Sequence, residues 1–177
     1  HVDSAACSAM RMQSYVQRAK GAKAGMASRD ELQRAHERAV GDAFVAWLNA
    51  NEGRDYRFAR QQENPDLVYK ESGSALGVEI CDAYYGDEVA KSTWAIAEGK
   101  LSASRTEIRE PDASLIQEIN TRLQKKALKR YGPNTVLVLH VDPAITTARD
   151  MESLVSLVEV PESHGFAAIY LVGTVEE

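Results

Sequence analysis

Residues 63–85 read ENPDLVYKESGSALGVEICDAYY, and this stretch decides the fold. Two apolar runs, residues 66–70 and 77–85, flank the segment ESGSA, a pattern that is typical of a β-hairpin. The first run begins at Asp66 and the second contains Glu79. A carboxylate inside a strand costs free energy unless something positive meets it. The stretch therefore predicts either a metal site or an unusual surface hairpin.

A helix is predicted on the N-terminal side of this hairpin, over residues 31–53. Ser28 or Asp30 would be its N-cap, and Gly53 would end it. Apolar residues and one histidine recur at helical spacing and form a single stripe: Leu32, His36, Val40, Phe44, Trp47 and Leu48. On such a stripe His36 is read more simply as a core histidine than as a base.

The remaining elements follow from the same patterns. We expect strands at 55–61, 135–141 and 166–173, and helices at 112–131 and 148–160, with Gly132 and Pro133 ending the first of these helices. A hairpin followed by crossover helices implies a mixed sheet with helices on both faces, hence an α/β fold. Residues 1–29 are expected to form a peripheral helix and linker, and residues 30–177 a single domain.

Composition narrows the class of protein. The chain has 177 residues, of which 44% are hydrophobic and 27% charged, as in a globular domain. Its apolar runs are too short to cross a bilayer, and no secretory leader is recognised at its start. Two cysteines, Cys7 and Cys81, favour reduced thiols in a cytoplasmic protein over a disulfide. A fragment of a longer exported chain stays open as an alternative. Four scattered histidines supply no zinc-type spacing.

Three carboxylates are predicted to face one another. Asp66 and Glu79 lie on neighbouring strands, and Glu79 shares its strand face with Cys81, while Ile80 points to the core. With Val40 at the centre of the helical stripe, Glu37 lies about 60° away and so faces inward. A divalent cation is the simplest way to balance three inward acids.

These residues resemble the PD-(D/E)xK, or restriction-endonuclease-like, nuclease superfamily. Its core runs helix, three antiparallel strands, helix, strand, and its motif begins with Pro-Asp, here Pro65-Asp66, followed by an acid on the third strand, here Glu79. The resemblance covers about residues 30–173. It implies a restriction-endonuclease-like core and metal-assisted hydrolysis of a phosphodiester, of DNA in preference to RNA.

The resemblance also implies the roles of the metal ligands. Asp66, Glu79 and the backbone carbonyl of Ile80 would bind Mg²⁺ (or Mn²⁺), and Glu37 would bind a second metal or orient a water. Purely structural explanations are also open: a turn at Asp66, a cross-strand ion pair at Glu79 and a position at the helix edge for Glu37.

The chain departs from the family motif at one position. The motif lysine, two residues after the acid, is Cys81 here, and a neutral thiol is a poor substitute for an amine. On the 112–131 helix, Lys126 falls on the stripe of Leu115, Ile119 and Leu123, and Arg130 is predicted to join it. Lys126 is therefore the expected replacement, with Lys70 as second choice.

The segment RLQKKALKRYG, residues 122–132, contains five basic side chains and no acid. Arg122, Lys125, Lys129 and Arg130 are candidate contacts for nucleic-acid phosphates; an ordinary solvated helix face explains them equally well. The net charge of the chain is −5, so affinity for DNA would depend on a homodimer, a protein partner or a separate targeting domain.

The sequence leaves two other functions open. The first is a nuclease-fold module that has lost catalysis with the motif lysine and binds nucleic acid or a protein partner. The second, less favoured, is an enzyme that uses Cys81 as a nucleophile; no histidine has an obvious route to this thiol in the sequence.

Overall fold

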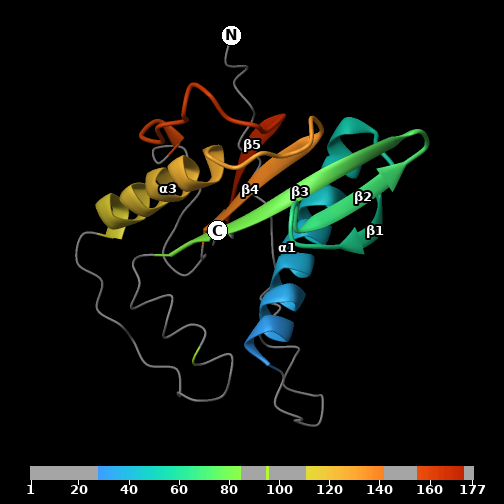
Figure 1. The fold of residues 1–177 in the computed structure, drawn as a ribbon, viewed down its shortest axis with the longest axis horizontal. Coiled ribbons are helices and arrows are strands. Elements are labelled where there is room, and N and C mark those ends of the chain that lie inside the picture. Colours follow the sequence, from blue (N-terminus) through green and yellow to red (C-terminus); the bar gives the residue numbers. More distant parts are fainter. Residues whose placement is uncertain (1–27, 85–94, 96–110, 142–154, 174–177) are drawn as a thin grey trace.

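A computed structural model describes residues 28–84, 95, 111–141 and 155–173 (Figure 1). The predicted N-terminal helix, residues 86–94 and 96–110, and the first part of the predicted 148–160 helix lie outside these ranges. The described residues form an α/β fold in which two helices pack on a five-stranded mixed sheet.

The sheet has the strand order β1-β2-β3-β4-β5. Its strands are β1 (Arg57–Gln61), β2 (Leu67–Glu71), β3 (Ser74–Ala83), β4 (Thr135–Val141) and β5 (Ala168–Gly173). The strand β2 is antiparallel to both β1 and β3, whereas β4 runs parallel to both β3 and β5. The predicted mixed sheet is thus observed, and β4 has the predicted bounds.

The helix α1 (Arg29–Glu52) begins and ends at residues predicted from its sequence. Ser28 is the N-cap and forms a capping box with Glu31, which satisfies amide groups that the first turn leaves unpaired. Gly53 follows the last turn with a φ of 65°, a left-handed conformation that glycine adopts without steric cost.

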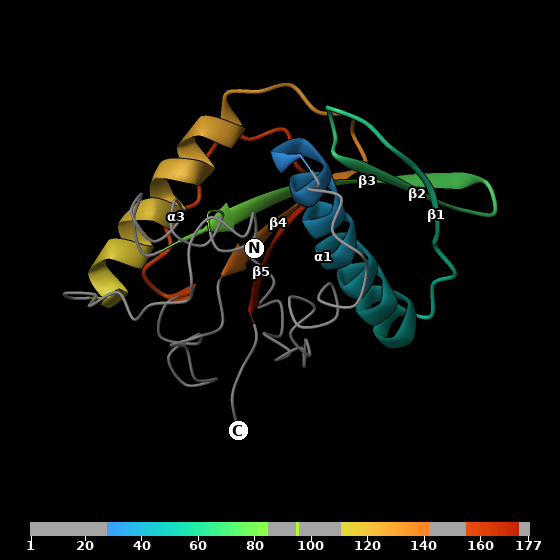
Figure 2. The ribbon, with the colours of Figure 1, turned by 90° about the horizontal axis from the view of Figure 1, so that it is seen from below.

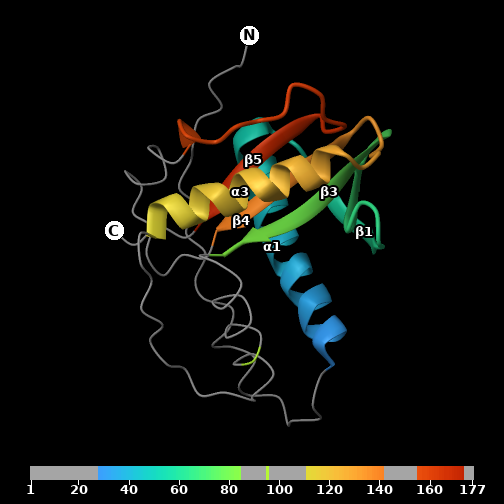
Figure 3. The ribbon, with the colours of Figure 1, turned by 60° about the vertical axis from the view of Figure 1, so that its left-hand side comes forward.

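The two helices cover opposite faces of the sheet, as Figure 2 shows with the sheet seen near its edge. On the α1 face, Val40, Phe44 and Leu48 pack on the side chains of β3 and β4 that include Val78 and Ile80. On the other face, α3 (Pro111–Ala127) lies across β3 and β4 (Figure 3) and buries Leu115, Ile119 and Leu123 against a second core. Successive residues of β3 therefore enter different cores.

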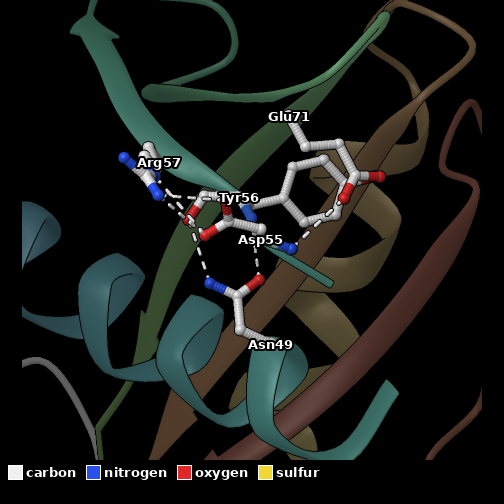
Figure 4. Close-up of polar contacts among 5 residues, drawn as sticks. All are labelled: Asn49, Asp55, Tyr56, Arg57 and Glu71. Atoms are coloured by element: carbon white, nitrogen blue, oxygen red, sulfur yellow. Dashed lines mark hydrogen bonds and ion pairs between the residues drawn. The ribbon is translucent and has the colours of Figure 1, made fainter. Parts of the chain in front are cut away.

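Polar contacts join the end of α1 to the start of β1 (Figure 4). The side chain of Asn49 accepts a hydrogen bond from the backbone N–H of Tyr56 and donates one to its carbonyl, both at 2.9 Å. Glu71, at the far end of β2, accepts a hydrogen bond from the amide of Asp55 and pairs with Arg54. These contacts fix where the chain turns from α1 into the sheet.

Two predicted helices end differently in the structure. The helix α3 ends at Ala127 rather than near Gly132, because the chain turns there and Tyr131 packs on Phe166, with ring centroids 4.4 Å apart. Of the predicted 148–160 helix, only Val155 is helical among the described residues, and Ser156 begins a turn. No helix in the described parts of the chain is long and apolar enough to span a lipid bilayer.

Candidate active site

Asp66 and Glu79 face each other where β2 and β3 separate. Leu67 and Val78 are the last pair in the register of these strands, so Asp66 and Glu79 occupy the next position. The amide of Ile80 donates to Oδ2 of Asp66 at 2.8 Å, and the amide of Asp66 donates to Oε2 of Glu79 at 3.3 Å. Each carboxylate thus takes a backbone donor that the neighbouring strand no longer uses.

Gly77 allows the segment before β2 to lie close to β3. A Cβ at this position would meet the Oγ1 of Thr135 at 2.7 Å and the Cγ of Pro65 at 2.8 Å. A larger residue would push Pro65, and with it Asp66, away from Glu79. The glycine therefore positions the Pro-Asp pair.

Glu79 is the most enclosed acid of the site, with 2% of its surface exposed. It forms an ion pair with Lys126, which reaches it from the last turn of α3, and it accepts a hydrogen bond of 3.1 Å from the hydroxyl of Tyr131. The inward orientation expected for Lys126 is thus observed. Tyr131 was not identified from the sequence, because its position depends on the chain turning after α3.

Lys126 and Tyr131, the two side-chain partners of Glu79, both keep their protons at neutral pH. Burial lowers the pKa of Lys126, but the hydrogen bond and charge of Glu79 outweigh this and raise it above the usual lysine value. Burial and the Glu79 charge raise the pKa of Tyr131 far above its usual range. Lys126 is therefore an ammonium group and Tyr131 a hydrogen-bond donor.

The ionised form of Asp66, unlike that of Lys126, is disfavoured, because its charged neighbours are mainly acids. Burial and the charge of Glu79 raise the pKa of Asp66 to about 7, and Glu37 adds to the rise, while the Ile80 amide and Lys126 oppose it. One ammonium group thus does not balance the negative charge of this cluster.

Glu37 approaches Asp66 from α1, on the other face of the sheet. Its carboxylate accepts hydrogen bonds from Gln33 at 2.8 Å and from Gln61, at the end of β1, at 3.2 Å. The side chain of Glu37 therefore reaches the sheet at β1, as its place on the helix predicts. Its negative charge helps to raise the pKa of Asp66.

Cys81 is a free, buried thiol on the same face as Glu79. Burial raises its pKa even though Lys126 and Arg122 lie close enough to oppose the rise. A thiol with a raised pKa is a weak nucleophile, so the geometry does not favour a cysteine-dependent enzyme. Cys81 behaves as a small apolar residue of the core beneath α3.

The basic residues of the 122–132 segment divide into two groups. Lys125, Lys129 and Arg130 are exposed, and Arg130 lies beyond the end of α3, so its predicted place on the helical stripe is wrong. Arg122 is half-buried and forms an i,i+4 ion pair of 2.6 Å with Glu118.

The second-choice lysine lies far from the acids along its strand. Lys70 is exposed and pairs with Ala75, one residue from the hairpin turn. Asp66 lies at the other end of β2, so Lys126 is the lysine that the fold brings to the acidic residues.

A second polar cluster was missed in the sequence. The four histidines are scattered along the sequence, but in the structure His36 and His140 both contact the carboxylate of Asp82 on the α1 face of the sheet. His36 is half-buried rather than a core residue. The alternation of β3 and β4 predicts that Asp82 and His140 share a face, but only their register shows that they are neighbours.

Comparisons of the chain with models of protein families, with curated proteins and with solved structures found no match. The functional conclusions therefore depend on the geometry of these residues.

Proposed function

We propose that the described residues form a restriction-endonuclease-like core and that the protein is a Mg²⁺-dependent nuclease which hydrolyses phosphodiester bonds, in DNA in preference to RNA. The observation that carries the proposal is the meeting of Asp66, Glu79 and Lys126 where β2 and β3 separate. Two acids that can bind a metal and an ammonium group beside them suit the metal-assisted hydrolysis of a phosphodiester.

The donor atoms at this position suit Mg²⁺ or Mn²⁺. Both ions prefer oxygen ligands, which the side chains of Asp66 and Glu79 and the backbone carbonyl of Ile80 offer; Asp66 faces Glu79, and Ile80 follows Glu79 on β3. The raised pKa of Asp66 supports the same assignment, because a cation would lower it and favour the ionised ligand. Glu37 is close enough to influence Asp66 and is the candidate ligand for a second ion.

The bound metal would supply a coordinated water of lowered pKa and positive charge beside the phosphate. Lys126 replaces the motif lysine in this proposal. Since its pKa is raised, it acts as a charged donor that orients the water or meets negative charge developing on the phosphate, rather than as a base. Tyr131 holds the Glu79 oxygen that also faces Lys126, and so positions this carboxylate.

Nucleic acid would approach along the C-terminal end of α3. Lys125 and Lys129 are exposed there, next to Lys126, and Arg130 follows directly. Their positive charge at the end of α3 offers contacts to phosphates that flank the scissile bond.

The proposal is tested by incubating supercoiled plasmid, linear duplex, single-stranded DNA and RNA with the purified protein and Mg²⁺ or Mn²⁺. We expect cleavage of DNA that stops with EDTA and falls about 1,000-fold in Glu79→Gln, because the variant loses a metal ligand. Glu63→Gln is the matched control, since Glu63 is an exposed acid two residues before Pro65. Cleavage by Glu79→Gln at the wild-type rate would refute the assignment.

A second candidate function rests on Cys81. Because a thiol occupies the position of the motif lysine, the protein could instead be a catalytically silent module that binds nucleic acid or a protein partner. In that case no substrate is cleaved, whereas the protein still retards DNA in a gel and Lys125→Glu weakens that binding. Absence of both cleavage and DNA binding would leave a protein partner as the target of this alternative.

A further inference from the structure

The cluster of His36, Asp82 and His140 lies apart from the site proposed for Mg²⁺. Glu79 and Asp82 are three residues apart on β3, so their side chains leave opposite faces of the sheet. Glu79 lies under α3, whereas Asp82 meets His36 from α1. No step of the proposed hydrolysis uses these three residues.

Three rigid elements bring the cluster together. His36 comes from α1, Asp82 from β3, and His140 from β4, where it is the registered neighbour of Asp82. Asp82 and His140 lie near the carboxyl ends of the parallel strands β3 and β4. Open α/β sheets commonly bind ligands at this edge.

The ring nitrogens converge on one carboxylate oxygen. Nε2 of His36 lies 2.7 Å from Oδ1 of Asp82, and Nδ1 of His140 lies 2.9 Å from the same atom. The two rings meet edge to face with centroids 5.3 Å apart, and the three ligand atoms all lie within 4.8 Å of one another. A tetrahedral zinc site places its ligand atoms about 3.3 Å apart, so small side-chain movements would admit an ion between them.

We propose that His36, Asp82 and His140 bind one divalent transition-metal ion of the Zn²⁺ class. Two imidazole nitrogens and one carboxylate oxygen suit Zn²⁺, Fe²⁺ or Co²⁺, whereas Mg²⁺ prefers oxygen ligands throughout. Binding requires both histidines to be neutral, with their protons on Nδ1 of His36 and on Nε2 of His140.

The three ligands leave room for a fourth. Catalytic zinc sites have three protein ligands and a water in the open position, while structural sites are closed. The side chain of His36 is 29% exposed, whereas those of Asp82 and His140 are 15% and 11% exposed. The site therefore opens towards solvent on the side of α1, and an ion there would tie α1 to β3 and β4.

The test uses the full chain stripped of metal with a chelator and then dialysed. Zn²⁺ binding is measured by calorimetry, and Co²⁺ binding by its visible absorption, which reports the coordination number. We expect one ion per chain at this cluster, Co²⁺ bands typical of four coordination, and affinity at least about 100-fold lower in His36→Gln and in His140→Gln.

Three controls separate this cluster from other ligands. His1→Gln and His164→Gln remove the remaining two histidines, and Glu63→Gln alters an exposed acid outside both sites. All three should bind Zn²⁺ as the wild type does. If His140→Gln fails to fold, His36→Gln decides the question, because His36 is the most exposed of the three. Unchanged affinity in that folded variant, or the absence of saturable binding to the wild type, would overturn the proposal.

Discussion

Asp66 and Asp82 are two partly buried aspartates on opposite faces of one sheet, and their pKa values move in opposite directions. Burial raises both values. At Asp66 the charges of Glu79 and Glu37 add to the rise, which brings the pKa to about 7. At Asp82 hydrogen bonds from His140 and His36 outweigh burial and hold the pKa below its usual range.

Burial alone therefore does not decide whether the pKa of an aspartate is raised or lowered. The partners delivered by the nearest helix decide it: α1 brings an imidazole to Asp82, whereas α3 brings its ammonium group to Glu79 rather than to Asp66. The Asp66 face is therefore short of positive charge and suited to a hard cation, while the Asp82 face has its own donors.

The largest effect is expected from removing the ammonium group of the Asp66 face. Lys126→Met should lower DNA cleavage by about 100-fold to 1,000-fold, because charge on the phosphate loses its donor. The neighbouring exposed lysine provides the control, Lys125→Met, which should keep most of the activity at saturating DNA. Initial rates on plasmid measure both.

The same variant can be used to test whether the lysine has been relocated. Cys81 lies on the same face as Glu79 and close to Lys126. Adding Cys81→Lys to Lys126→Met should restore at least about tenfold of the lost rate, since it returns an amine to the position where the family motif carries it. Failure of rescue in a folded double variant would show that position 81 does not reach the reacting groups.

A smaller effect is expected from neutralising Asp82. In metal-free protein at pH 7, Asp82→Asn should lower the free energy of unfolding by about 2 kcal/mol, because two histidine donors lose a charged acceptor. The folded pKa of Asp82 is lowered, so its contribution is present above about pH 4 and is lost as the pH falls further. Chemical denaturation at pH 7 and pH 3 measures this, and an equal difference at both values would contradict it.

Neutralising Asp66 should have the opposite sign. Its folded pKa is raised, so the protein loses stability as the pH rises from about 4 through about 7. In EDTA at pH 8, Asp66→Asn should therefore raise the free energy of unfolding by about 1 kcal/mol and Tm by about 2–4 °C, although it abolishes cleavage. Added Mg²⁺ should stabilise the wild type and not the variant. A lower Tm for the variant in EDTA would refute the imbalance of charge at this face.

The smallest effect is expected at Cys81. Because this thiol is buried and its pKa is raised, Cys81→Ala should change the cleavage rate by less than about threefold. In a Cys7→Ser background, iodoacetamide should react with the folded protein much more slowly than with the unfolded chain. Loss of cleavage in Cys81→Ala would instead support the hypothesis of an enzyme that uses Cys81 as a nucleophile.

Local sequence patterns determined much of this protein. The N-cap at Ser28, one of two candidates in the sequence, the stop at Gly53 and the buried run of β4 each depend on neighbours within a few residues, and all three are observed in the structure. The same is true of the inward direction of Lys126, since helical periodicity alone places it on the stripe of Leu123.

Tertiary structure decided what periodicity cannot describe. Helical spacing continues through Arg130, yet α3 ends at Ala127, because the contacts of Tyr131 with Phe166 and Glu79 outweigh helix propensity. His36 and His140 are 46 and 58 residues from Asp82 in the sequence, and their meeting depends on strand register and on the packing of α1. A local pattern assigns a side chain to a face, but only packing across the sheet selects its partner.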